Sequence, residues 1–417
     1  MVLFLLCLMY LITYIDRVNI STAAIAFRKD LNLSATDYGS IFAAFGITYA
    51  LFQIIGGWIG DRFGPRATLG VCGFIWAAST IFTGLANGFW GLILARLALG
   101  LGEGATFPTS TRAMSSWTRV GWRGFAQGIT HSFSRFGNAV APPIVAALIL
   151  AWSWRGSFVA LGLVSLVWVV LWVVYFRDNP REHRGISEAE LAVLPPYRGG
   201  QYETNPVPWR RLVPRMMPTT IVYFCYGWTL WLYLSWMPQY LQHAQNLDLK
   251  NAAWFSSAVF FAGVVGDTMG GVVSDRIYRI TGNLATARRN TVLGSLVLSL
   301  LFLIPVLFVH DIVVLAACLA AAFFCLELTI GPIWSVPMDI APLHAGTASG
   351  IMNTGSAVAA IVSPFVFGVV IDATGSWNLP FVFSIGLLLV GAVLTFWMRP
   401  DRTIGEAPEA AVRPQTA

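Results

Sequence analysis

Twelve long apolar stretches constrain what this chain can fold into. A helix that crosses a bilayer needs roughly 20 mostly apolar residues. Windows of that kind lie at residues 2–27, 37–60, 67–86, 89–114, 126–151, 157–176, 216–242, 251–274, 290–309, 312–338, 347–371 and 378–398. Only 11% of the 417 residues are charged, against about 25% in ordinary soluble domains. The sequence therefore predicts an all-α polytopic membrane protein with twelve transmembrane helices.

One long polar segment divides these windows into six and six. It covers residues 177–215 and is rich in proline, glycine and charge. Within it, Ser187 and Glu190 have the S-x-x-E spacing of a helix capping box, so we expect a short surface helix there. The predicted domains are an N-terminal six-helix bundle (1–176), a cytoplasmic linker (177–215), a C-terminal six-helix bundle (216–398) and a cytoplasmic tail (399–417).

The two halves share short internal repeats. "GWIGDR" at residue 57 is echoed by "GVVSDR" at residue 271, an offset of 214. Further along, Ala126, Gly128, Ile129 and Pro142 are matched at an offset of 222 by Ala348, Gly350, Ile351 and Pro364. Such repeats predict two pseudo-symmetric six-helix bundles, with a substrate site between them near the midplane of the membrane.

The distribution of basic residues predicts the orientation. If the first span runs outward, the inner loops and the tail hold 18 of the 26 Lys and Arg residues, the outer loops hold four, and four lie within spans. Lys and Arg accumulate on the cytoplasmic side of membrane proteins, so we expect both termini in the cytoplasm and a bacterial cytoplasmic membrane as the location. The basic residues form short loop clusters, without the aromatic-interleaved patch that nucleic-acid binding uses.

Charged residues inside the spans are the candidates for function. "TYIDRVNIS" places Asp16 beside Arg17 in an otherwise apolar span, and Arg96 lies seven residues before Glu103, which puts both on one helix face about 10 Å apart in depth. Charges in a membrane are costly and are usually kept for substrates or ions. A permanently charged guanidinium offers a planar fork to a carboxylate, and a desolvated carboxylate can exchange protons near neutral pH. The structural alternative is a set of ion pairs that only holds the helices together.

Several motifs resemble those of the major facilitator superfamily. "GWIGDRFGPR" matches its cytoplasmic loop motif through Gly57, Asp61, Arg62, Gly64 and Arg66. The second-half copy keeps Asp275 and Arg276 but has Tyr278 where a glycine is expected, and "RLALGLGEG" matches the fourth-helix pattern. Within the superfamily the chain resembles the anion:cation symporters, on the segments "YIDRVNIS", "FPTSTRAMSSW", "YGWTLWLYLSWMPQYL", "SVPMDIAP" and "VVIDATGSW".

The resemblance implies roles for individual residues. Arg17 matches the position that clamps a substrate carboxylate, Arg96 serves the site or its gate, and Asp16 and Glu103 correspond to the protonated carboxylates. Substrate-contacting positions are matched by Tyr14, Tyr49, Asn353 and Trp334. The motif residues Asp61, Arg62 and Arg66 are interpreted as a latch between helices.

One further site residue comes from the internal repeat. His131 aligns with Asn353 at the offset of 222, so pseudo-symmetry places it near the same cavity, and a packing histidine is the alternative. Arg135, Asp267 and Glu327 also lie within spans, but no motif assigns them a role.

The sequence thus predicts a secondary active transporter and not an enzyme. It would import a small organic anion, a sugar acid or related carboxylate, with protons by alternating access, as a monomer without cofactor or metal. Two alternatives on the same fold are sodium coupling and an aromatic-acid or dicarboxylate substrate. A membrane-embedded enzyme is disfavoured because there is no DDxxD metal motif, and a nutrient sensor is disfavoured because the tail after Arg399 is short.

Overall fold

A computed structural model describes residues 1–33, 35–197, 206–241, 245, 247 and 249–404. These residues form helices joined by short connections, and none of them lies in a strand. The first half contains α1 (Val2–Asp30), α2 (Ala35–Phe63), α3 (Pro65–Leu85), α4 (Phe89–Gly104), α5 (Thr106–Trp117), α6 (Arg123–Trp152) and α7 (Trp154–Tyr175). The second half contains α9 (Trp209–Gln239), α10 (Leu249–Thr281), α11 (Asn290–Leu303), α12 (Ile312–Glu327), α13 (Ile330–Ile340), α14 (Ala345–Thr374) and α15 (Leu379–Leu394).

Every apolar window of the sequence corresponds to helix in the structure. Ten of the helical segments are long and apolar enough to cross a membrane. The two remaining windows are α4 with α5, which carry Arg96, Glu103 and Arg112, and the aromatic helix α9. Two windows that read as single helices are broken, the fourth at Ala105 and the tenth between Glu327 and Ile330. The prediction of twelve transmembrane helices is therefore confirmed, with a break in the fourth and the tenth.

Local sequence signals account for several helix ends. Gly64 adopts a φ of 84°, which favours glycine, and Pro65 then starts α3 where its missing N–H costs nothing. The carboxylate of Asp311 caps α12 by accepting hydrogen bonds from Val313 N (3.0 Å) and Val314 N (2.9 Å). In the linker, the predicted capping box of Ser187 and Glu190 is confirmed at the start of α8 (Glu188–Val193).

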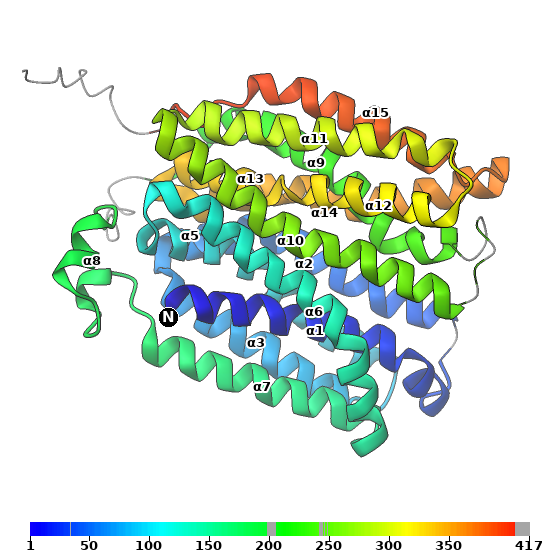
Figure 1. Ribbon diagram of the computed structural model, residues 1–417. Helices are drawn as coiled ribbons and strands as arrows, with labels where there is room; N and C mark the ends of the chain where they lie inside the picture. Colours follow the sequence, from blue (N-terminus) through cyan, green and yellow to red (C-terminus); the bar gives the residue numbers. More distant parts are fainter. Residues whose placement is uncertain (34, 198–205, 242–244, 246, 248, 405–417) are drawn as a thin grey trace, which may run out of the picture.

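The helices form two halves that lie against each other with their axes roughly parallel (Figure 1). In the first half α3 packs on α7, α1 on α6 and α2 on α4, and in the second half α9 packs on α14 and α10 on α12. The main contacts between the halves are those of α6 with α10 and α13, and those of α14 with α2 and α5. Glycines permit this close approach, since a Cβ on Gly128 would collide with the backbone of Asp267, and one on Gly350 with the backbone of Gln53. These two glycines are the pair matched at the repeat offset of 222.

One end of the bundle is tightly closed. It is the end where α8 lies, formed by the last turns of α2, α5, α10 and α13 and the first turns of α3, α6 and α14, and we call it the α8 end (Figure 1). Every residue of α13 is buried, and every residue of α5 except Trp117. Since both helices follow the breaks in their spans, the broken segments fill the space between the halves at this end.

Candidate functional site

An ion pair between α1 and α4 forms the centre of the candidate site. Arg17 Nε donates to Glu103 Oε2 at 2.6 Å. The Glu103 side chain is fully buried, whereas 20% of the Arg17 side chain is exposed. Among the described residues, Arg17 Nη2 and Glu103 Oε1 are buried without a hydrogen-bond partner. The pair therefore keeps hydrogen-bonding capacity that the protein itself does not use.

Aromatic rings surround the Arg17 guanidinium. Its central carbon lies 4.5 Å from the ring centre of Tyr49, 4.9 Å from Tyr14, 5.4 Å from Phe45 and 5.5 Å from Phe107. Each ring face attracts a cation by about 0.5–2 kcal/mol. The rings come from three helices and hold the guanidinium in place, while Glu103 supplies its counter-charge. The sequence placed Tyr14 and Tyr49 with Arg17, and the structure brings them together.

Asp16 faces the other side of α1. Its Oδ2 accepts hydrogen bonds from Trp76 Nε1 (2.5 Å) and Ser165 Oγ (3.3 Å), while Oδ1 has no hydrogen-bond partner among the described residues. The buried guanidinium of Arg96 interacts electrostatically with both Asp16 and Glu103. The four charged residues that the sequence singled out in the first and fourth spans thus form one cluster.

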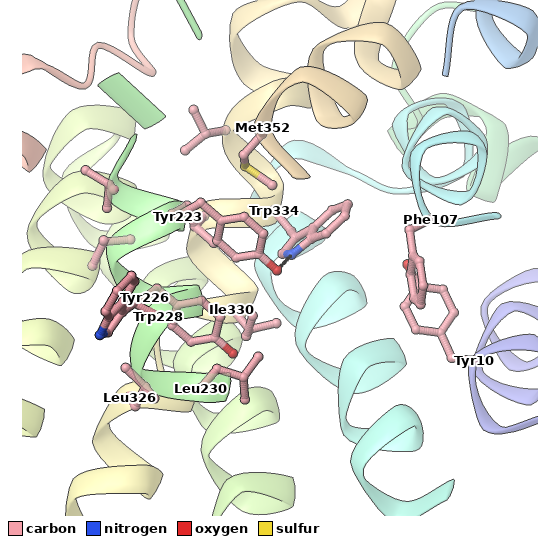
Figure 2. Close-up of a cluster of buried hydrophobic side chains, with 14 of the residues drawn as sticks. Tyr10, Phe107, Tyr223, Tyr226, Trp228, Leu230, Leu326, Ile330, Trp334 and Met352 are labelled. Atoms are coloured by element: carbon pink, nitrogen blue, oxygen red, sulfur yellow. Dashed lines mark hydrogen bonds between the residues drawn. The ribbon is translucent and has the colours of Figure 1, made fainter. Parts of the chain in front are cut away.

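The predicted residues of the later helices lie at the boundary between the halves. Trp334 is buried and donates from Nε1 to the hydroxyl oxygen of Tyr223 at 2.9 Å, and these two rings face Tyr10 and Phe107 across the boundary (Figure 2). The Phe107 ring centre is 6.3 Å from that of Trp334. Because Phe107 also lies against Arg17, it connects the Arg17 site to the second half.

His131 lies among these same rings. Its ring centre is 4.8 Å from Trp334, 5.0 Å from Tyr10 and 6.0 Å from Phe107, and its Nδ1 is 2.9 Å from the carbonyl oxygen of Gln127. Asn353 is placed differently, because its amide donates to Gln53 Oε1 at 2.7 Å in the contact of α14 with α2. The structure therefore joins His131 and Trp334 to the Arg17 region, and it places Asn353 in a polar contact between the halves.

Sequence reasoning missed a second charge cluster between the halves. Arg135 on α6 contacts both Glu327 and Asp267 of the second half, and Tyr226 joins them. All of these residues were visible as charged or polar groups within spans. Their pairing was not visible, because the partners of Arg135 lie 91 to 192 residues away in the sequence and no motif links them.

The motif residue Asp61 joins the halves at the α8 end. Its carboxylate accepts hydrogen bonds from Gly346 N (2.9 Å), Thr347 N (2.6 Å) and Thr347 Oγ1 (2.6 Å) at the start of α14. Arg112 Nε lies 3.7 Å from the same carboxylate, and Arg112 Nη1 donates to the carbonyl of Pro342 at 2.8 Å. A carboxylate at a helix N-terminus is stabilised by the unpaired N–H groups and by the helix dipole. Asp61 is therefore placed as a latch between α2 and α14.

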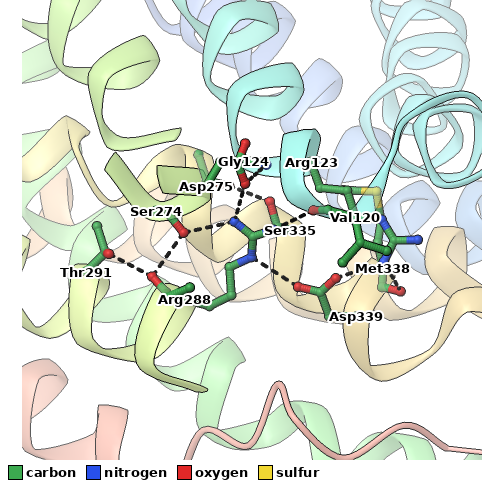
Figure 3. Close-up of polar contacts among 12 residues, drawn as sticks. Val120, Arg123, Gly124, Ser274, Asp275, Arg288, Thr291, Ser335, Met338 and Asp339 are labelled. Atoms are coloured by element: carbon green, nitrogen blue, oxygen red, sulfur yellow. Dashed lines mark hydrogen bonds and ion pairs between the residues drawn. The ribbon is translucent and has the colours of Figure 1, made fainter. Parts of the chain in front are cut away.

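The second-half copy of the motif makes the corresponding contact. Asp275 accepts hydrogen bonds from Gly124 N (3.1 Å) and Phe125 N (2.7 Å) at the start of α6. Figure 3 shows how the fully buried Arg288 lies between Asp275 (2.7 Å) and Asp339 (3.1 Å), with Arg123 donating to Asp339 at 2.8 Å. Both halves thus use a motif aspartate to bind the first turn of a helix in the other half.

The remaining motif residues are peripheral to these contacts. A Cβ on Gly57 would collide with the backbone of Gly346, so Gly57 lets α2 approach α14. Arg66 donates from its backbone N–H to Asp178 at 2.9 Å, next to Gly64, whereas Arg62 is exposed and stacks on rings of its own helix. Arg276 is exposed as well.

A polar cavity of about 130 Å³ opens beside the Asp61 latch. Its lining includes Asp61, Arg62, Arg112, Asp178 and Tyr197. Burial raises the pKa of Asp178, against the opposing effect of the hydrogen bond from Arg66 N. This cavity belongs to the closed α8 end and not to the Arg17 region.

Twelve spans in two repeated halves, with buried charges between them and aspartate contacts that join them at one end, define a membrane transporter built from two related bundles. The model of the Major Facilitator Superfamily matches residues 6–364 and, in a second match, residues 280–416. The chain belongs to this superfamily and is a transporter, not an enzyme.

Two curated relatives are similar over nearly the whole chain. The "Probable sulfoacetate transporter SauU" of Cupriavidus necator is 48% identical over 414 residues, which are 99% of this chain and 96% of the relative. The "Hexuronate transporter" of Bacillus subtilis is 31% identical over 404 residues, with 96% and 94% covered. Among solved structures, the fucose:proton symporter FucP of E. coli has a TM-score of 0.73 at 13% identity, covering 95% of this chain and 98% of that one, which shows the shared fold.

Proposed function

We propose that the protein imports a small organic anion together with protons, and that Arg17 binds the anion. The observation that carries this proposal is the Arg17–Glu103 pair. It is a buried ion pair in which the guanidinium is partly exposed, is enclosed by aromatic rings and has an Nη2 without a hydrogen-bond partner among the described residues. The fork of a guanidinium binds a carboxylate or sulfonate through two parallel hydrogen bonds.

The geometry suggests how substrate and proton are coupled. Glu103 and an incoming anion compete for the same guanidinium, since the Glu103 oxygen lies 2.6 Å from Arg17 Nε. A proton on Glu103 removes its negative charge and frees Arg17 for the substrate. When the substrate carries one negative charge, the loaded Arg17 site holds one guanidinium and one anionic group and is neutral, which lowers the cost of moving it within a low-dielectric interior. Asp16, beside Arg96 and hydrogen-bonded by Trp76, is the second proposed proton acceptor.

The names of the relatives narrow the substrate class. A sulfoacetate transporter and a hexuronate transporter both act on small organic acids. Sulfoacetate is the first compound to test, because the sulfoacetate relative shares 48% identity over 99% of this chain. The aromatic rings around Arg17 would provide apolar contact to the carbon chain of a short anion.

The proposed orientation in the membrane assigns a side to the closed α8 end. The excess of Lys and Arg in the loops of the α8 end supports a cytoplasmic location for that end. The Asp61 and Asp275 contacts would then close the transporter towards the cytoplasm. Import by alternating access requires these contacts to break after substrate and protons have bound.

The test is uptake by the full chain in proteoliposomes with an imposed pH gradient. We expect sulfoacetate or a hexuronate to accumulate when the outside is acidic. Arg17→Ala should abolish binding and uptake, and Glu103→Gln should keep substrate exchange but lose accumulation driven by the pH gradient. Arg181→Ala, at an exposed linker arginine, is the matched control and should behave like the wild type. Uptake that follows a sodium gradient and ignores pH would replace the proton by sodium as the coupling ion.

A further inference from the structure

A second group of buried charges lies between the halves, and the proposed function does not use it. Arg135 comes from α6 in the first half, whereas Asp267 on α10 and Glu327 at the end of α12 come from the second. Arg135 Nη2 is 3.2 Å from Glu327 Oε2, and Arg135 Nε is 3.8 Å from Asp267 Oδ2. Both carboxylates are fully buried and the Arg135 side chain is 6% exposed. Three ionisable groups therefore share one water-poor site.

The charges of this cluster do not balance. It holds two carboxylates and one guanidinium, and the groups that face it from the neighbouring helices are phenols. Tyr226 on α9 donates to Glu327 Oε2 at 2.8 Å, and Tyr14 on α1 and Tyr223 on α9 interact with it electrostatically. His131, one turn before Arg135, lies among the rings of Tyr10, Phe107 and Trp334 and bonds to Gln127. An uncompensated buried carboxylate is costly, and binding a proton removes that cost.

The carboxyl groups are placed to hold such a proton between them. Among the described residues, neither oxygen of Asp267 nor Oε1 of Glu327 has a hydrogen-bond partner. Both carboxylates contact the same guanidinium, with Glu327 Oε2 3.2 Å from Arg135 Nη2 and Asp267 Oδ2 3.8 Å from Arg135 Nε. A proton on either carboxyl group adds an O–H donor and leaves one negative charge to balance Arg135. Close helix packing enforces the arrangement, because a Cβ on Gly266 would lie 3.1 Å from that of Glu327.

Pseudo-symmetry relates Glu327 to Glu103. Glu103 lies next to the end of α4, and Glu327 is the last residue of α12, so each carboxylate sits at the break of its span. Glu103 accepts a hydrogen bond from Arg17 on α1, the first helix of its own half. Glu327 likewise accepts a hydrogen bond from Tyr226 on α9, the first helix of the second half. Tyr226 thus occupies the place that Arg17 has in the first half, but it carries no positive charge. Arg135 of the first half supplies that charge to Glu327.

We propose that Asp267 and Glu327 form a second proton-binding site, in which the two carboxyl groups share one proton and Arg135 balances the remaining charge. The part played by this proton in transport rests on the proposed function, but its presence does not. Because Arg135 belongs to the other half, loss of the proton would leave two carboxylates attracted to a guanidinium across the boundary. The protonation state of this site would then influence how tightly the halves are held together at the midplane.

Infrared spectroscopy of the purified full chain tests the proposal directly. The carbonyl stretch of a protonated carboxylic acid is separate from the bands of carboxylates. At neutral pH, the difference spectrum between wild type and Asp267→Asn, and that between wild type and Glu327→Gln, should each show the loss of one such band. Either substitution leaves one carboxylate paired with Arg135, which needs no proton. Asp372→Asn, at an exposed carboxylate of α14, is the control and should leave the band unchanged. The proposal would be overturned if either single variant kept the carbonyl band of the protonated acid at the wild-type intensity.

Transport provides a second, independent measurement. The proton-to-substrate ratio, obtained from the gradient at which uptake reverses in proteoliposomes, should fall by one in both single variants while substrate binding persists. An unchanged ratio together with an unchanged infrared band refutes this site and leaves the proposed function intact. Absence of any organic-anion uptake by the wild type refutes the proposed function, and the infrared result still stands. The double variant should lower the melting temperature, because it leaves Arg135 buried without a counter-charge, whereas the single variants should not.

Discussion

The Asp61 latch offers the sharpest test of how the closed state is held. In Asp61→Asn the side chain keeps one acceptor oxygen and loses its charge. Whichever way the amide is oriented, an NH2 group replaces one of the oxygens that now accept hydrogen bonds from Gly346 N, Thr347 N and Thr347 Oγ1. Arg112, 3.7 Å away, also loses its carboxylate. We expect the closed state to be weakened at the α8 end.

The size of the effect follows from the bonds lost. Hydrogen bonds to a charged group contribute about 1.5–3 kcal/mol each. The amide can keep both bonds to Thr347 and lose the one from Gly346 N, so the loss is about 1.5–3 kcal/mol, a roughly 10- to 100-fold shift in the ratio of closed to open molecules. Interaction of the carboxylate with the α14 dipole adds to this in the same direction.

Distance measurements between spin labels would detect the shift. Labels at the exposed positions Arg119 in the first half and Arg276 in the second report opening at the α8 end. Asp61→Asn should add or strengthen a long-distance population, whereas Arg62→Gln, at an exposed residue of the same motif, should not. The reasoning is refuted if the Asp61→Asn distances match the wild type, or if Arg62→Gln produces an equal change.

Three further perturbations test packing, pH dependence and capping. Gly266→Ala places a methyl group against the backbone of α12 and should lower the stability of the protein by about 1–3 kcal/mol. The control Gly294→Ala meets nothing within 4 Å and should be neutral or stabilise the protein by up to about 1 kcal/mol. Thermal unfolding in detergent compares the two variants, and equal melting temperatures would contradict the packing argument. Hydrogen bonds from Arg155 and Trp154 lower the pKa of Asp30, so its contribution to stability is present above its unfolded pKa and is lost as the pH falls through the folded value. Asp30→Asn should therefore flatten the acid limb of a melting-temperature profile, and an unchanged limb would show that other groups cause it. Ser187→Ala removes the capping box of α8 and should destabilise that helix by about 1 kcal/mol. Amide hydrogen exchange within α8 should become faster while substrate uptake stays unchanged. Slower uptake would mean that α8 acts in transport.

Much of the fold could be predicted because the signals that define a membrane helix lie in neighbouring residues of the sequence. The length of an apolar stretch fixes a span, and the capping box at Ser187 and the proline at Pro65 fix helix starts from neighbouring residues alone. The breaks at Ala105 and after Glu327 escaped prediction, since no polar loop interrupts either window at that point. Gly128 and Gly350, which the repeat matches at the offset of 222, occupy equivalent contacts between the halves in the structure.

The candidate site was predicted less completely. Asp16, Arg17, Arg96 and Glu103 were identified because charges stand out in apolar spans, and the structure brings them into one cluster. Their assignment to substrate and protons stays a proposal. The site would be incomplete without Phe107, which the sequence offered as one aromatic residue among many and which the fold places between Arg17 and Trp334.

The sequence by itself determined that the chain lives in a bilayer, where its spans lie, and which few charges must be buried within them. Only the tertiary structure decided the partners. Arg17 with Glu103, Arg135 with Asp267 and Glu327, and Asp61 with the start of α14 are separated by 86 to 286 residues. Helical periodicity fixes the face and depth of a side chain on its own helix. Which helix lies opposite that face depends on how the twelve spans pack, and no local pattern contains that information.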